Sequence, residues 1–239
     1  MHYNNEYQRG YNMLSYETLN LLFLAVIGLA LIAQTMVTNS YRRYSRIENG
    51  RNLTGAQAAN EFLLRQGVRD VQIVAINGFL NDHYDPATKT IRLSRANYEG
   101  NSISAVSIAA HEAGHAIQHA ENYSMLVLRN KMVPTVNFAN RLLWIAIIGG
   151  IFLGLADLIL LGAIMFGVIA IFQLITLPVE FDASAKALNF LDSSVLNYEE
   201  ASGAKKVLFA AALTYVVALL TSLVQVARFL VIFGGNRRR

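Results

Sequence analysis

LLWIAIIGGIFLGLADLILLGAIMFGVIAIFQLITLPV, residues 142–179, is a long apolar run near the middle of this chain. Its single charged residue, Asp157, lies close to its centre. Because one helical span of a bilayer takes about 20 residues, a run of this length has room for two spans. We expect a hairpin of two membrane helices that turns at GLADL, residues 154–158, and brings the chain back to the side that it left.

Two further apolar runs lie on either side of this hairpin. LLFLAVIGLALIAQTMV, residues 21–37, predicts a first span over residues 19–39, and a last span is expected over residues 207–234. The residues before the first span are nearly neutral and lack the basic start and cleavage site of a signal peptide, so we expect that span to be retained. The pattern predicts a mostly α membrane protein with about four transmembrane helices.

The composition agrees with a membrane location. Only 15% of the residues are charged and 54% are hydrophobic, whereas soluble proteins carry about 25% charged residues. The net charge is +4, but no basic stripe with interleaved aromatic residues is present, so we expect no nucleic-acid partner. The chain has no cysteine, which excludes disulfides, a thiol nucleophile and any cysteine-based zinc site.

A small α+β unit is predicted between the first and second spans. Its expected elements are a helix capped by Thr54 and ended by Gly67, strands at 71–76 and 90–94, and a helix capped by Asn101 or Ser102. The strand TIRLS, residues 90–94, is either an edge strand that pairs with an extended peptide or an interior strand. We expect Pro134 to close the segment after the second helix, and Pro178 to precede a separate amphipathic helix, EFDASAKALNFLD.

AAHEAGHAIQHA, residues 109–120, lies in the middle of the second predicted helix. His111 and His115 are four residues apart, so their imidazoles share one helix face and can hold one Zn²⁺. Glu112 lies beside them and can take a proton from a metal-bound water, as in the HExxH metalloproteases. His119 lies about 12 Å along the axis from His111 on a straight helix, so we expect it to be no ligand but a residue either at the lip of the site or in contact with a ligand side chain.

A catalytic zinc usually has three protein ligands, so a third ligand must come from another segment. Glu180 is the best candidate, because it follows a hairpin that returns the chain to the side of the motif. The competing acidic residues are Glu61, Glu121, Asp192, Glu199 and Glu200.

Several motifs resemble the YugP-type bacterial membrane proteins, a family classed among the neutral zinc metallopeptidases. They are HYDPATKTIRLS, SAVSIAAHEAGHAIQHAENY, RNKMVP and TLPVEFDASAKAL, and the resemblance covers about Ala58 to Tyr215. The order of motif helix, membrane hairpin and glutamate also resembles the HtpX-type membrane proteases. The resemblance implies a bacterial cell-membrane endopeptidase with one Zn²⁺ per chain, held by His111, His115 and Glu180, and with Glu112 as general base.

One position departs from the HtpX-type pattern, which has an aspartate four residues after the ligand glutamate. Here that position is Ser184, so either Ser184 or Asp182 is expected to orient a histidine ligand. Three residues are candidates to stabilise the oxyanion of the tetrahedral intermediate: His83, Tyr84 and Arg129.

The predicted ranges, in chain order, are a tail (1–18), the first span (19–39), a zincin-like unit (40–140), the hairpin (141–179), a helix with the third ligand and a connector (180–206), the last span (207–234) and a basic tail (235–239). Arginines at 42, 43, 46 and 51 follow the first span closely, which favours a cytoplasmic site by the positive-inside rule. The arginines at 237–239 then fall on the outer side unless the last segment stops short of crossing.

Three functions compete. The first is a membrane-embedded zinc endopeptidase that acts on peptides or membrane proteins. The second is a zinc transporter, which the polar flanks of the motif helix disfavour because that helix is too polar to be a span. The third is a scaffold with a catalytically silent zinc site, which the presence of Glu112 disfavours. The sequence does not predict an oligomeric state.

Overall fold

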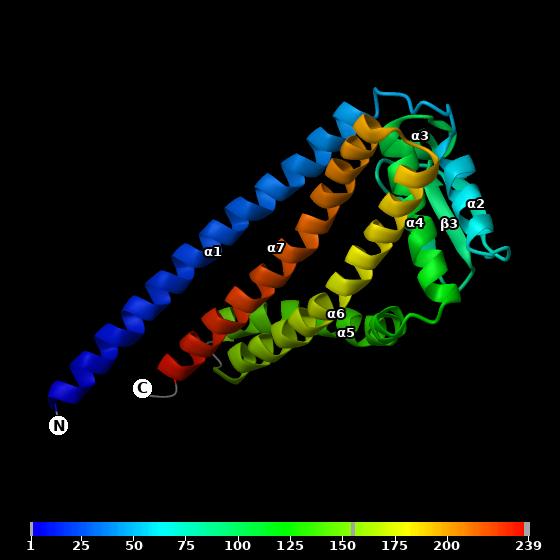
Figure 1. Ribbon diagram of the computed structural model, residues 1–239. Coiled ribbons are helices and arrows are strands. Elements are labelled where there is room, and N and C mark those ends of the chain that lie inside the picture. Colours follow the sequence, from blue (N-terminus) through cyan, green and yellow to red (C-terminus); the bar gives the residue numbers. More distant parts are fainter. Residues whose placement is uncertain (1, 154–155, 237–239) are drawn as a thin grey trace. The chain divides into compact units, whose positions relative to one another are not determined.

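The computed structural model describes residues 2–153 and 156–236 (Figure 1). Its elements, in chain order, are α1 (His2–Tyr44), α2 (Gly55–Arg65), β1 (Gln72–Ile76), β2 (His83–Asp85), β3 (Thr90–Ser94), α3 (Arg95–Glu99), α4 (Ile103–Ala120), α5 (Ser124–Leu153), α6 (Ala156–Ser194) and α7 (Tyr198–Asn236). The described chain is therefore mostly helical, with one small sheet. The turn that we expected at GLADL includes residues 154–155, which lie outside the described residues.

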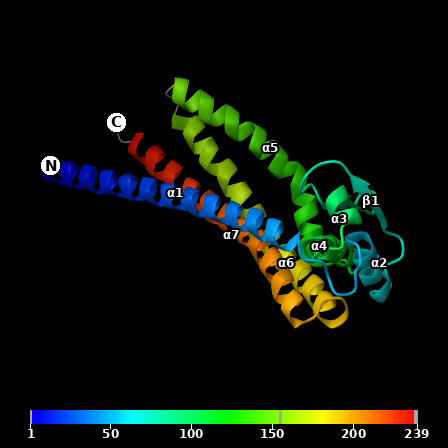
Figure 2. The same ribbon diagram turned by 90° about the horizontal axis from the view of Figure 1, so that it is seen from above.

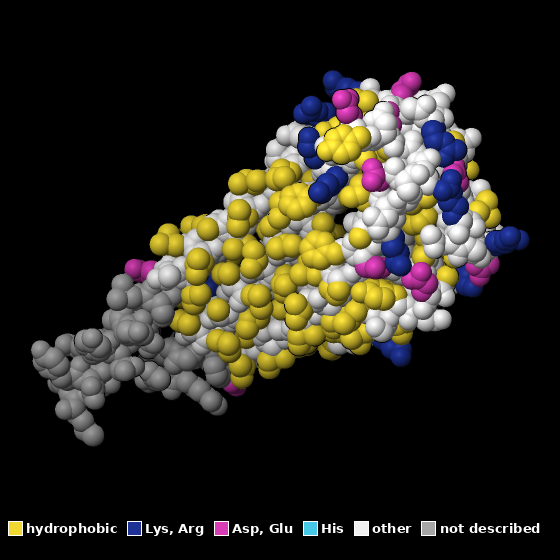
Figure 3. Space-filling view, in the orientation of Figure 1, with side chains coloured by type: hydrophobic (Ala, Val, Ile, Leu, Met, Phe, Trp, Pro, Cys, Tyr) yellow, Lys and Arg dark blue, Asp and Glu magenta, His cyan; other side chains and the backbone are white. Residues whose placement is uncertain are grey.

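Four of these helices are long and apolar enough to cross a membrane: Tyr16–Tyr44, Ser124–Gly150, Asp157–Ser194 and Tyr198–Ile232. Many of their large apolar side chains are exposed, among them Leu21, Leu31 and Trp144, which are each more than 60% exposed. Figure 3 shows hydrophobic side chains covering the surface of the long helices, with few charged residues among them. Side chains of this kind suit contact with lipid.

The chain divides into two compact units, and each takes residues from distant parts of the sequence. The first unit contains Met1–Ile32, Arg129–Ile175 and Tyr215–Arg239, and the second contains Ala33–Leu128 and Thr176–Thr214. The second unit therefore includes the end of α6 and the start of α7. We expected this unit to lie entirely between the first and second spans, which the structure does not confirm.

Polar side chains join the first and last spans inside the first unit. Arg228 of α7 donates from Nε to Asn20 of α1 at 3.0 Å and lies 4.2 Å from the ring centroid of Phe23. Its Nη1 donates to Gln225. Figures 1 and 2 show α1 and α7 running side by side. The part of α1 around Asn20 thus lies beside the part of α7 around Arg228 within the first unit.

Two prolines lie inside helices, contrary to the prediction. Pro134 lies within α5, and Pro178 lies within α6, which continues unbroken from the hairpin through Glu180 to Ser194. Proline removes one backbone donor and usually ends a helix in water. In a bilayer, a chain that left the helix would expose further unsatisfied backbone groups, so the helix continues through the proline.

The sheet has the strand order β1–β3–β2, with β1 parallel and β2 antiparallel to β3. TIRLS is thus the central strand and not an edge strand, and its Ile91 and Leu93 side chains are fully buried. The sequence predicted β1 and β3 but missed β2, whose three residues lie in a segment rich in turn residues.

The caps of the two helices next to this sheet follow the predicted chemistry. Thr54 and Gln57 form a capping box at the start of α2, and the Ser102 hydroxyl accepts from the Ala105 amide at the start of α4. Gly55 lies so close to α3 that a Cβ there would be 2.1 Å from the Asn97 carbonyl oxygen. A Cβ at Gly55 would also lie 2.9 Å from the Ala105 carbonyl oxygen of α4, so the backbones of α2, α3 and α4 are closely packed at this point.

Candidate metal centre

The two motif histidines come from the middle of α4. Most of this helix is buried, and its core-facing positions are alanines that allow close packing, among them Ala109, Ala110 and Ala113. His111 and His115 lie one turn apart, with ring centroids 4.7 Å apart and ring planes at 80°. The helix therefore presents both imidazoles on one face, as the spacing predicts.

Glu180 of α6 lies against this face. Its Oε2 is 3.3 Å from His111 Nε2 and 3.6 Å from His115 Nε2, and its side chain is 2% exposed. The three ligand atoms all lie within 4.8 Å of one another. The structure thus brings together the three residues that the sequence analysis named as ligands.

This geometry fits a zinc ion. With bonds of about 2.0–2.1 Å, neighbouring ligands of a tetrahedral zinc are separated by about 3.3–3.4 Å. The distances of 3.3 and 3.6 Å between Glu180 and the histidines are close to that separation. Two imidazoles and one carboxylate also form a donor set typical of catalytic zinc.

Each histidine has a different partner on its second ring nitrogen. His111 Nδ1 lies 3.1 Å from the Ser184 hydroxyl, and His115 Nδ1 lies 3.0 Å from Gln118 Oε1. Gln118 Nε2 donates to Asp182 Oδ2 at 2.8 Å. The two positions that the sequence left as alternatives are thus both used: Ser184 contacts His111 directly, and Asp182 reaches His115 through Gln118.

Glu112 follows His111 on α4 and is 8% exposed. Its charge acts on the neighbouring ligand. Burial lowers the pKa of His115, but the hydrogen bond and charge of Glu180, the charge of Glu112 and the contact with Gln118 outweigh burial, and the net direction is upward. A second carboxylate, besides that of Glu180, therefore lies close enough to His115 to act on its charge.

The remaining histidine of α4 lies outside the ligand group. His119 Nδ1 is 2.8 Å from the hydroxyl oxygen of Tyr84 on β2. Burial, with help from the Asp70 and Asp85 carboxylates, raises the pKa of Tyr84 to about 12, so this phenol is protonated at neutral pH. Their hydrogen bond joins the end of the motif helix to the edge of the sheet.

The two other residues that were candidates to stabilise the oxyanion, His83 and Arg129, do not share the contacts of Tyr84. The exposed His83 has its Nδ1 2.8 Å from the carbonyl oxygen of Asn81, within its own loop. Arg129 belongs to α5 in the first unit. The oxyanion role of His83, Tyr84 and Arg129 stays a prediction.

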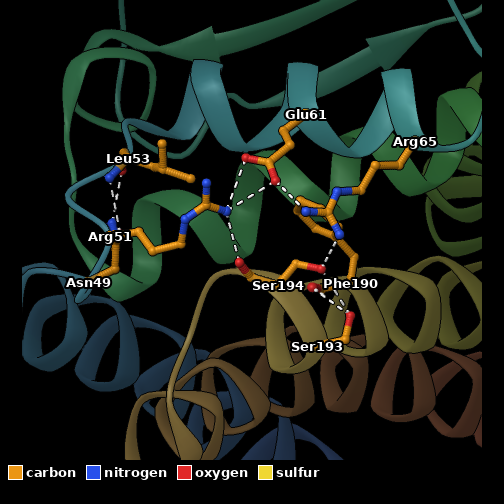
Figure 4. Close-up of polar contacts among 8 residues, drawn as sticks. All are labelled: Asn49, Arg51, Leu53, Glu61, Arg65, Phe190, Ser193 and Ser194. Atoms are coloured by element: carbon orange, nitrogen blue, oxygen red, sulfur yellow. Dashed lines mark hydrogen bonds and ion pairs between the residues drawn. The ribbon is translucent and has the colours of Figure 1, made fainter.

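Acidic residues that competed with Glu180 have other partners. Glu61 of α2 accepts from Arg51 at 3.0 Å and from Arg65 at 2.7 Å, and Figure 4 shows both arginines also reaching Ser194 at the end of α6. Glu121 pairs with Lys186, and Glu200 caps α7 through the Asn197 amide. Asp192 and Glu199 are exposed.

One residue of the site, Gln118, was missed in the sequence, and a second residue, Gly114, lies beside the site. Gln118 is fully buried, and Gly114 lies where α4 meets α6. A polar residue three positions after a ligand histidine, on the same helix face, was the available signal for Gln118. The contact of Gly114 depends on a segment far away in the sequence and gave no local signal.

Four membrane-length helices and a histidine pair that faces a buried glutamate define a membrane protein with a candidate zinc site. A family model described as "Putative neutral zinc metallopeptidase" matches residues 19–234, and the chain belongs to that family. It is also 47% identical over 218 residues to "Putative membrane protease YugP" of Bacillus subtilis (strain 168), covering 90% of this chain and 96% of that protein. No solved structure matches the chain.

Proposed function

We propose that this protein is a membrane-embedded zinc endopeptidase of the HExxH, gluzincin-like type, with one zinc per chain. The observation that carries the proposal is the approach of His111, His115 and Glu180 to within 4.8 Å of one another. The family and the relative from Bacillus subtilis support a protease. These three residues would hold the ion through two imidazole nitrogens and one carboxylate oxygen.

Each residue around this site has a separate role in the proposed hydrolysis of a peptide bond. Zinc, when bound, polarises the scissile carbonyl and lowers the pKa of the attacking water. Glu112 accepts the proton of that water and passes it to the leaving amine, so the carboxylate acts first as base and then as acid. Ser184 and Gln118 hold the outer nitrogens of the two histidines and keep their inner nitrogens directed at the site.

The substrate is a peptide or a membrane protein, and the long apolar helices lie in the bilayer of a bacterial cell. The arginines at the end of α1 favour a site on the cytoplasmic face. The motif helix α4 is not among the four helices of membrane length, which supports a peptidase over a zinc transporter.

The test compares the detergent-purified protein with Glu112→Gln. We expect each to bind about one zinc, and only the parent to cleave an unfolded model protein, because the substitution removes the base and leaves the ligands. We expect a strong chelator to abolish cleavage by the parent and added zinc to restore it. Zinc binding without cleavage by either protein would instead favour the silent scaffold, and a parent without zinc would refute the ligand assignment.

A further inference from the structure

Gln118 is fully buried between the motif helix and α6. Its Nε2 donates to two oxygens of α6, the Val179 carbonyl at 2.8 Å and Asp182 Oδ2 at 2.8 Å. An amide nitrogen carries two hydrogens, so both donors of Gln118 are used. Val179 and Asp182 lie on either side of Glu180 in the chain, and Gln118 therefore holds the helix segment that carries the third ligand.

These two contacts decide which way the amide of Gln118 points. A backbone carbonyl and a carboxylate accept hydrogen bonds but cannot donate them. A flipped amide would place Oε1 against two acceptor oxygens and leave all three without a hydrogen between them. The chemistry of the partners thus requires Nε2 to face α6, and Oε1 to face His115 Nδ1 at 3.0 Å.

The orientation of this amide in turn decides the tautomer of His115. Because Oε1 can only accept, His115 Nδ1 must carry the hydrogen. In the neutral imidazole the lone pair then lies on Nε2, the atom that faces Glu180 Oε2 at 3.6 Å. A metal in the site needs its lone pair from this nitrogen.

His111 has no such constraint. Its partner is the Ser184 hydroxyl, at 3.1 Å, and a hydroxyl can either donate or accept. Ser184 can adapt to either tautomer, whereas Gln118 permits only one. The two histidines of the motif are therefore held by different chemistry.

We propose that Gln118 is a positioning residue that sets the tautomer of His115 and aligns the Glu180 segment, so that both ligands are prepared for the metal before it binds. This inference rests on the proposed zinc site. Gln118 touches neither substrate nor metal, and it acts through His115 and through the α6 backbone.

The test measures zinc affinity by chelator competition in Gln118→Met, which keeps the approximate shape but loses all three hydrogen bonds. We expect the dissociation constant for zinc to rise about ten- to hundredfold, the usual effect of losing an outer partner of a ligand. Ser107→Ala is the matched control. It removes a fully buried polar group of the same helix, whose hydroxyl bonds the Ile103 carbonyl and not the site, and we expect it to keep parental affinity.

A double variant that exchanges the amide and the carboxylate between positions 118 and 182 supplies a readout that general destabilisation would not produce. Gln118→Glu alone places two carboxylates in contact at residues 118 and 182 and weakens zinc binding at least tenfold. Adding Asp182→Asn restores a donor, because the new amide can donate to one oxygen of the residue-118 carboxylate while His115 donates to the other. The residue-118 carboxylate still faces the Val179 carbonyl in the double variant, so we expect zinc affinity to recover in part, to a value about threefold or more better than that of Gln118→Glu.

The outcomes separate this inference from the proposed function. Parental zinc affinity in folded Gln118→Met, or a double variant that binds no better than Gln118→Glu, would overturn the positioning role alone. A parent that binds no zinc would overturn the metal site and the positioning role together. Weak binding in both single variants at position 118, with recovery in the double variant, is the result that we expect.

Discussion

Gly114 of α4 lies against the backbone of Ala183 of α6. A Cβ at position 114 would be 2.8 Å from the carbonyl oxygen of Ala183 and 3.2 Å from its Cα. Both obstacles are backbone atoms, which cannot move aside as a flexible side chain can. The absence of a side chain at Gly114 therefore allows the motif helix to approach α6 closely enough for Glu180 to reach the histidines.

Substitution of this glycine tests the contact. In Gly114→Ala the two helices must separate to relieve the overlap, since overpacking at a backbone contact is not absorbed by rotamer changes. We expect zinc affinity to fall about tenfold or more, the range found when a site's supporting contacts are lost. Gly28→Ala is the control, because a Cβ at Gly28 would meet nothing within 4 Å. Equal zinc affinity in the two variants would contradict the role given to the contact.

The contact between Ser184 and His111 can also be tested by substitution. Ser184→Ala removes the hydroxyl that lies 3.1 Å from His111 Nδ1. We expect the zinc dissociation constant to rise about tenfold, at the lower end of such effects, because a hydroxyl is a weaker anchor than a carboxylate. Ser184→Asp supplies an acceptor at the same place, and we expect it to bind zinc better than Ser184→Ala. The chelator competition assay measures both, and the reverse order would refute the contact.

The choice of Glu180 over the competing acids is tested by paired substitutions. Glu180→Gln removes the carboxylate that lies 3.3 and 3.6 Å from the histidines, and we expect the purified protein to lose its zinc. Glu61→Gln removes a partly exposed partner of Arg51 and Arg65 and should leave zinc bound. Its thermal stability should fall only slightly, by about 1 kcal/mol or less, as for other solvent-accessible ion pairs. Zinc analysis and thermal unfolding in detergent check both expectations.

The sidedness of the site is testable because the chain contains no cysteine. Asp157→Cys and Tyr198→Cys place single thiols at exposed positions near the two ends of α6, the first in its first turn and the second at the first residue of α7. A membrane-impermeant maleimide should label Asp157→Cys in intact cells and Tyr198→Cys only after lysis. The reverse pattern would place the site outside, and labelling of both in intact cells would contradict a full crossing by α6.

The tertiary position of the basic segment after α1 supports this test. A Cβ at Gly203 of α7 would be 2.6 Å from the ring of Tyr44, at the end of α1. Tyr198 therefore belongs to the same end of the second unit as the arginines that follow the first span. From the positive-inside rule we therefore predict that Tyr198 is on the cytoplasmic side.

Much of the fold follows from local pattern. Hydrophobic length predicts the four spans because a bilayer sets how many apolar residues a helix needs. Cap residues predict the starts of α2 and α4, since Thr54 and Ser102 satisfy free backbone amides within their own first turns. The three-residue strand β2 was missed, because its pairing partner and not its own composition makes it a strand.

The spacing of His111 and His115 by itself places two imidazoles on one helix face, because the period of the α-helix is local. Tertiary structure decided three further features of the site. They are the choice of Glu180 among six acidic residues, the contacts of Ser184 with His111 and of Gln118 with His115, and the approach of Gly114 to Ala183. The contacts that join α4 to α6, among them those of Ser184 with His111 and of Gln118 with Asp182, span more than sixty residues of chain. Local sequence carries no signal for such contacts, because they arise only when two distant helices pack together.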